Sequence, residues 1–171
     1  CRASNYIHLL RKALEKAGLG HVPVISLSIA GLEKHPGFQL TLPLVMKMMY
    51  GVLYGDLLMT LVNQCKPYEV EKGTAQALAD RWTRQLAGEL TARSTGGYRR
   101  VKANYRRILD QFAAIPMERR DTLKVGVVGE IFVKYSPLGN NNLEQFLVDE
   151  GAEVVIPGLM DFCLYCVYNN M

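Results

Sequence analysis

The chain has 171 residues, of which 49% are hydrophobic and 21% charged, a balance that supports a packed globular domain and excludes intrinsic disorder. Its 20 lysines and arginines exceed its 16 acidic residues by only four, so charge alone does not imply nucleic-acid binding. Four unevenly spaced cysteines make no disulfide framework, and no signal-peptide pattern opens the chain, which together favour a reducing, cytoplasmic compartment.

The first predicted elements are a helix and a strand. Apolar residues recur at helical spacing between Tyr6 and Ala17, and Gly18 follows as a stop. Residues 22–28, VPVISLS, then have the composition of a strand, and Pro23 is tolerated near its start.

Residues 41–117 carry three helical patterns and no strand pattern. The first is apolar on nearly every face and approaches transmembrane length over residues 42–62. Lys47 and Asp56 interrupt this run, so we expect a buried helix rather than a membrane span. We interpret the whole stretch as a helical insertion or subdomain within an α/β domain.

The second and third helical patterns are amphipathic and predict an antiparallel pair. The second has an apolar stripe centred on Trp82, and the stripe of the third includes Tyr98 and Tyr105. The outer side of the third helix carries Arg99, Arg100, Lys102, Arg106 and Arg107. We favour a solvated face over a phosphate-gripping or nucleic-acid-binding face, because both tyrosines belong to the apolar stripe and leave no stacking platform.

The C-terminal third predicts two parallel strands joined by one crossover helix. Apolar runs at residues 125–128 and 154–156 are typical of strands that are buried on both faces. Asn141 or Asn142 is expected to cap the helix, with Glu144 or Gln145 completing a capping box, and Gly151 is expected to end it.

The loop after the first of these strands is the predicted ligand site. It leaves the carboxyl end of a strand and leads to a helix N-terminus, where free amides favour an anionic group. In this interpretation Glu130 orients a ligand and Lys134 meets an anion. The side chains that complete the pocket are Asn140, Asn141 and Asn142.

The cysteines are the candidate metal ligands. Cys163 and Cys166 form a C-x-x-C pair, which serves a metal or a redox disulfide in some proteins, but its apolar flanks favour structural packing. Cys1 precedes Arg2 and a helix start, where a thiolate is stabilised and ligates metals. The sequence offers no hydrolytic triad and no dinucleotide fingerprint, so we assign no catalytic residue.

Several of these segments together resemble a known protein family. CRASNYIHLLRKAL at the start, VPVISLS, VGVVGEIFVKYSPLGNNN and EGAEVVIPGLMDFCLYC resemble the large activator-related proteins of the 2-hydroxyacyl-CoA dehydratase system, the activators of 2-hydroxyglutaryl-CoA dehydratase or CoA-substrate-specific enzyme activases. The resemblance implies an anaerobic, cytoplasmic system in which ATP-driven electron transfer reaches a dehydratase that carries a [4Fe-4S] cluster. It also implies that Cys1 is a cluster ligand, matching the cysteine of a Gly-Pro-Cys-Arg motif.

Sequence and resemblance together predict one α/β domain over residues 1–171, with three layers, a mainly parallel sheet of the Rossmann or flavodoxin-like kind, and the helical insertion. We expect it to be a fragment of a longer chain, inactive alone, that supports the dehydratase through acyl-CoA and the other components of the system. The alternative is a non-catalytic interaction or assembly module, for which self-association is compatible with the sequence. We expect neither a membrane nor a nucleic acid as partner.

Overall fold

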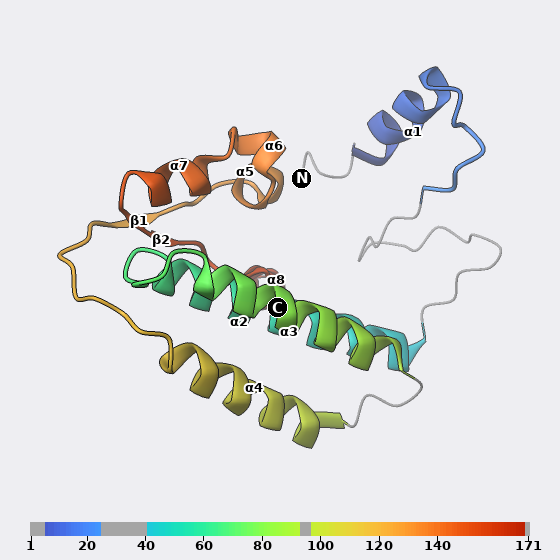
Figure 1. Ribbon diagram of the computed structural model, residues 1–171. Helices are drawn as coiled ribbons and strands as arrows, with labels where there is room; N and C mark the ends of the chain where they lie inside the picture. The colour runs from blue at the N-terminus through green and yellow to red at the C-terminus, as the bar shows by residue number, and fades with distance from the viewer. Residues whose placement is uncertain (1–5, 25–40, 93–96, 170–171) are drawn as a thin grey trace. The chain divides into compact units, whose positions relative to one another are not determined.

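The computed structural model describes residues 6–24, 41–92 and 97–169 (Figure 1). The chain divides into two compact units, Cys1–Thr41 and Leu42–Met171. In the first unit, helix α1 (Tyr6–Lys16) ends as predicted at Gly18, whose φ is +73°. The N–H of Leu19 donates to the Leu14 carbonyl at 2.8 Å, the long-range hydrogen bond of a Schellman cap. From residue 25 on, the predicted strand lies outside the described residues.

The second unit begins with three helices, α2 (Leu42–Cys65), α3 (Thr74–Thr91) and α4 (Gly97–Ala113). The predicted antiparallel pairing of α3 and α4 is confirmed at both ends, because Arg100 pairs with Glu89 at 3.0 Å and Trp82 Nε1 donates to Gln111 Oε1 at 2.9 Å. These helices enclose an apolar core that includes Tyr54, Leu58, Val62, Cys65, Ala75, Leu78, Trp82, Leu86, Val101, Ile108 and Phe112.

Helix α2 is the shared wall of the second unit, since it contacts α3, α4, β2 and α8. This helix is long and apolar enough to cross a membrane, but core helices of soluble proteins can have the same length and composition. Its buried residues all lie in the C-terminal half, between Tyr54 and Cys65, while Leu42, Met46 and Met49 are exposed. The expectation of a buried helix therefore holds for half of α2.

Strands β1 (Lys124–Gly126) and β2 (Glu153–Val155) are parallel, as predicted, and Val125 is in register with Val154. Val127 and Val154 are buried, but Val128 is 79% exposed, so the expectation that the first strand is covered on both faces is wrong. The described residues contain no further strand, and the chain is helix-rich with one βαβ unit. The three-layer sheet stays a prediction.

The connection between the strands is three short helices, α5 (Ile131–Tyr135), α6 (Pro137–Asn140) and α7 (Leu143–Asp149), not one. Ser136 is extended ahead of Pro137, because a residue before proline avoids the helical region, and this separates α5 from α6. Asn141 and Asn142 have φ of 54° and 57°, left-handed values that end α6.

The predicted capping box of α7 is wrong, while its predicted end is confirmed. Asn142 makes no side-chain cap; instead Asn140 Oδ1 accepts from the Leu143 N–H at 3.2 Å. The Gln145 side chain donates forward to Asp149 at 2.7 Å and does not reach back. Gly151, with φ of +82°, ends the helix.

Helix α8 (Leu159–Asn169) is held at its N-terminus by a side chain from α2. The N–H groups of Leu159 and Met160 donate to Asp56 Oδ1 and Oδ2 at 2.9 and 2.8 Å. Asp56 is thus the cap of a helix 103 residues away in sequence. No residue of α8 is buried.

Candidate functional site

The first side chain of the predicted ligand loop, Glu130, has a local structural role. It is the N-cap of α5, and its Oε2 accepts from the Phe132 N–H at 2.9 Å. An N-cap carboxylate satisfies an amide that the helix leaves without a partner. Capping of α5 is therefore the role that the geometry gives to Glu130.

Lys134, one turn further on, is buried with an exposed fraction of 7%. Its ammonium lies 4.5 Å from the centroid of the Tyr135 ring, a cation–π contact. In the part of the chain that the structure describes, this ammonium has neither an ion pair nor a hydrogen bond. The side chain of Lys134 is thus largely buried while its Nζ keeps contact with solvent, and Lys134 is the cation of the loop that has no ion-pair partner among the described residues.

A cavity of about 460 Å³ opens beside Lys134. Its walls are Lys134, Tyr135, Pro137, Asn140, Asn142, Glu144 and Gln145. The Tyr135 hydroxyl donates to the Pro157 carbonyl at 2.5 Å, which ties one wall to the segment after β2. The cavity is therefore built by the connection between the parallel strands, and one of its walls is anchored to the segment that follows the carboxyl end of β2.

The structure brings together three of the five predicted loop residues. Lys134, Asn140 and Asn142 line the cavity, whereas Glu130 and Asn141 do not. The side-chain oxygen of Asn140 is already in use, because Oδ1 accepts a hydrogen bond from the Leu143 N–H. An ammonium with amide groups beside it is suited to a carboxylate or phosphate group.

The cysteines do not form a metal centre within the described residues. No group of three or more potential ligands from His, Cys, Asp or Glu occurs there. Cys163 is exposed and Cys166 is half-buried on α8, so the expectation of two packed core cysteines is wrong for Cys163. Cys1 lies outside the described residues.

A second cavity, of about 700 Å³, collects titratable groups that the sequence reasoning missed. Glu153 is 4% exposed; it accepts from the Tyr68 hydroxyl at 2.7 Å and pairs with Lys124 at 3.0 Å. Burial alone raises the pKa of Glu153, but the hydrogen bonds from Tyr68 and Lys124 outweigh it, and the pKa lies below the ordinary value. The same hydrogen bond to Glu153 raises the pKa of Tyr68.

The group formed by Tyr68, Lys124 and Glu153 is a structural link between the helices and the strands. Both carboxylate oxygens of Glu153 are used, and the Cys65 thiol at the same cavity has a pKa raised by burial and by the charge of Glu69. A thiol with a raised pKa is a poor nucleophile. The signal available in the sequence was a single acidic residue directly before the apolar run at residues 154–156.

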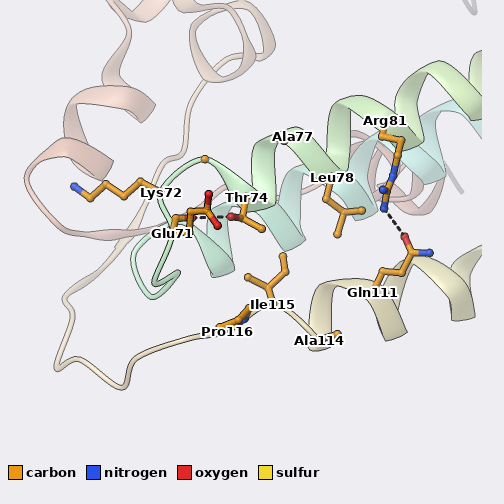
Figure 2. A pocket seen from close by; sticks show the side chains of 11 residues that line it. Glu71, Lys72, Thr74, Ala77, Leu78, Arg81, Gln111, Ala114, Ile115 and Pro116 are labelled. Atoms are coloured by element: carbon orange, nitrogen blue, oxygen red, sulfur yellow. Dashed lines mark hydrogen bonds between the residues drawn. The ribbon is translucent and has the colours of Figure 1, made fainter.

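Figure 2 shows a third cavity, of about 600 Å³, between the start of α3 and the end of α4. Arg81 and Trp82 both donate to Gln111 Oε1, and the Thr74 hydroxyl donates to the Glu71 carbonyl. These polar groups are engaged with one another. Lys72 also lines this groove, and its side chain makes no ion pair or hydrogen bond within the described part of the chain.

Comparison of the chain with protein-family models, with curated proteins and with solved structures gives no match. The resemblance to the dehydratase activators is thus supported by the quoted sequence segments alone, and the assignment of the cavity at Lys134 is supported by its geometry alone.

Proposed function

We propose that this chain is a supporting domain of an activator-related protein of the 2-hydroxyacyl-CoA dehydratase system, and that the cavity at Lys134 binds an anionic group of an acyl-CoA. The domain does not carry out the chemistry itself. It holds a ligand while ATP-driven electron transfer to a [4Fe-4S] acyl-CoA dehydratase is performed by the other components.

One observation carries the proposal: Lys134 is 7% exposed as a residue, lines the cavity, and has no anion paired with it among the described residues. An anionic ligand would supply the missing counter-charge, and Asn140 and Asn142 are at hand for its remaining oxygens. The parallel strands, with α2 and α7 both in contact with β2, are also compatible with the three-layer α/β fold that the resemblance implies.

The test is calorimetric titration of the chain with 2-hydroxyglutaryl-CoA, free CoA and 2-hydroxyglutarate. Lys134→Met keeps the length of the side chain and removes its charge, so it should weaken the ligand roughly ten- to hundredfold, the value of one charge-assisted hydrogen bond. Lys72→Met, at an exposed lysine, is the matched control and should bind as the parent does. Equal affinities of the two variants would refute the assignment.

Cluster binding is a separate part of the proposal and depends on Cys1. The measurement is iron and acid-labile sulfide in anaerobically prepared protein, beside its Cys1→Ala variant. Cluster content that is independent of Cys1 would remove that residue as a ligand. The described residues provide no cluster site, and no step of the proposal at Lys134 runs through one.

The second candidate function is an assembly module, favoured by the exposed apolar side chains of α8. Leu164, Tyr165, Val167 and Tyr168 are between 58% and 79% exposed. Sedimentation velocity over a range of concentrations tests it: self-association that Leu164→Glu abolishes and Leu138→Glu preserves would support this candidate. A monomer at all concentrations would refute self-assembly.

A further inference from the structure

The excess positive charge of the whole chain is concentrated on one helix. Helix α4 contains five lysines and arginines and one acidic residue, Asp110, a net charge of +4. The chain as a whole has 20 basic and 16 acidic residues, also +4. The rest of the chain therefore balances at 15 against 15, and α4 is the electrostatically distinct surface.

All five cations lie on the outer side of α4, away from its buried residues Val101, Asn104, Ile108 and Phe112. Arg100 pairs with Glu89. The other four cations make no ion pair and no side-chain hydrogen bond in the part of the chain that the structure describes; they are Arg99, Lys102, Arg106 and Arg107. Most of the charge on this face is thus unused within the domain.

The exposure of Tyr98 differs from what the apolar spacing of this helix predicts. Tyr98 was expected in the apolar stripe, but it is 70% exposed, and Leu109 on the same helix is 45% exposed. An aromatic and an aliphatic side chain therefore accompany the cations at the surface. Arginine with tyrosine is the composition that protein interfaces favour.

We propose that the outer face of α4 docks an acidic surface of a partner protein in the same system. This inference rests on the proposed function, in which the domain acts beside the other protein components of the system. Transient protein complexes use small interfaces, and complementary charge speeds and orients their encounter.

A protein fits this face better than a nucleic acid or a lipid surface. The cations occupy residues 99–107, about 12 Å along the helix axis, whereas nucleic-acid binding typically neutralises about six to ten phosphates. The remainder of the chain has 15 basic and 15 acidic residues, so it adds no net positive charge to that of α4. The apolar stripe of α4 is buried in the helical core, so the helix has no apolar face to insert into a bilayer.

The experiment compares two variants with the same net charge of zero. Arg99→Gln/Lys102→Gln/Arg106→Gln/Arg107→Gln empties the face, and Lys12→Gln/Lys16→Gln/Lys72→Gln/Arg84→Gln removes four exposed charges elsewhere. The probes are a fluorescein-labelled oligoglutamate peptide and a single-stranded oligonucleotide of equal net charge. Binding is measured by anisotropy at several salt concentrations.

We expect the parent to bind the peptide with an affinity that falls as salt rises. The α4 variant should lose at least about fivefold in affinity, since four solvated ion pairs of about 1.5- to 5-fold each are removed, and the control variant should stay close to the parent. No binding by the parent, or equal loss in both variants, would overturn the proposal. Tighter binding of the oligonucleotide would overturn it in favour of a nucleic acid.

This test is independent of the anion site at Lys134. The peptide contains no acyl-CoA, so Lys134→Met should bind it as the parent does. Conversely, the α4 variant should keep the parent's affinity for 2-hydroxyglutaryl-CoA if that ligand occupies the cavity at Lys134. The two binding measurements can therefore refute the α4 docking proposal and the Lys134 ligand proposal independently of each other.

Discussion

The bond between Asp56 and the start of α8 gives a sharp prediction about the stability of the second unit. Two backbone N–H groups, those of Leu159 and Met160, donate to the two oxygens of this carboxylate. Gly158 makes the approach possible, because a Cβ at this position would lie 2.8 Å from Asp56 Oδ2 and 2.9 Å from its Cγ. The carboxylate and the glycine should therefore be energetically coupled.

The magnitudes follow from the number of bonds lost. Asp56→Ala leaves two amides without their acceptor and should lower the free energy of unfolding by about 2 kcal/mol, the upper range for loss of a helix cap. Asp56→Asn keeps one acceptor oxygen and should cost about half as much. Gly158→Ala in the parent should cost about 1–3 kcal/mol, because the Asp56 carboxylate must leave its two hydrogen bonds to make room.

A double-mutant cycle in urea measures the coupling. The fluorescence of Trp82 is a suitable probe, since it is the chain's one tryptophan and is 4% exposed in the helical core. In the Asp56→Ala background the clash is gone, and Gly158→Ala should be neutral or stabilise by about 0.4–1 kcal/mol, as alanine restricts the unfolded chain. Hydrogen exchange at Leu159 and Met160 should accelerate in the Asp56 variants.

Additivity would refute this reasoning. If Gly158→Ala costs the same with and without the Asp56 carboxylate, the close approach does not limit the packing of α8. Unchanged exchange at the first amides of α8 in Asp56→Ala would likewise show that Asp56 does not cap the helix.

Three further predictions concern buried polar groups. Both side-chain polar atoms of Asn63 are buried and have no hydrogen-bond partner among the described residues, so Asn63→Leu should raise the free energy of unfolding by about 1 kcal/mol, and a loss of stability would show that Asn63 has a bound partner. The pKa of Glu153 is lower in the folded than in the unfolded state, so the stability that its charge contributes is present above about pH 4.3 and is lost as the pH falls through the folded-state pKa. The parent should therefore lose more stability between about pH 5 and pH 3 than Glu153→Gln does. Parallel stability profiles of the two proteins in acid would contradict this. Glu69 accepts from the N–H groups of Gly73 and Ala75 at 2.6 and 2.8 Å, so Glu69→Ala should cost about 1–2 kcal/mol in the same urea assay, and a cost near zero would mean that water replaces this cap.

Periodicity was enough to predict the helical core, because burial in α3 and α4 is set by each helix's own spacing. Trp82, Ile108 and Phe112 are buried as expected. Tyr98 matches the same spacing but is exposed, since it belongs to the first turn of α4, at the end of the pair. A stripe predicts which face turns inward, but not where the neighbouring helix ends.

The candidate site was predictable in place but not in detail. The parallel strands identified the loop, and Lys134 was recognised as its cation. The assignment of the helix cap to Asn141 or Asn142 failed because it assumed one helix, whereas Ser136, Pro137 and two left-handed residues divide the connection. Asp56 was seen only as an interruption of an apolar run, because its partners lie more than 100 residues away in sequence.

Asn63 and Lys134 both have side chains without a hydrogen bond or ion pair among the described residues, and the difference between them bears on function. Asn63 lies in α2 among core residues, and its replacement by leucine is expected to stabilise the fold. Lys134 opens onto a cavity with two asparagines, so an anion can pair with its ammonium. Bound ligand should therefore raise the free energy of unfolding of the parent and leave that of Lys134→Met unchanged. Stabilisation by a ligand that depends on Lys134 distinguishes a binding residue from a packing defect.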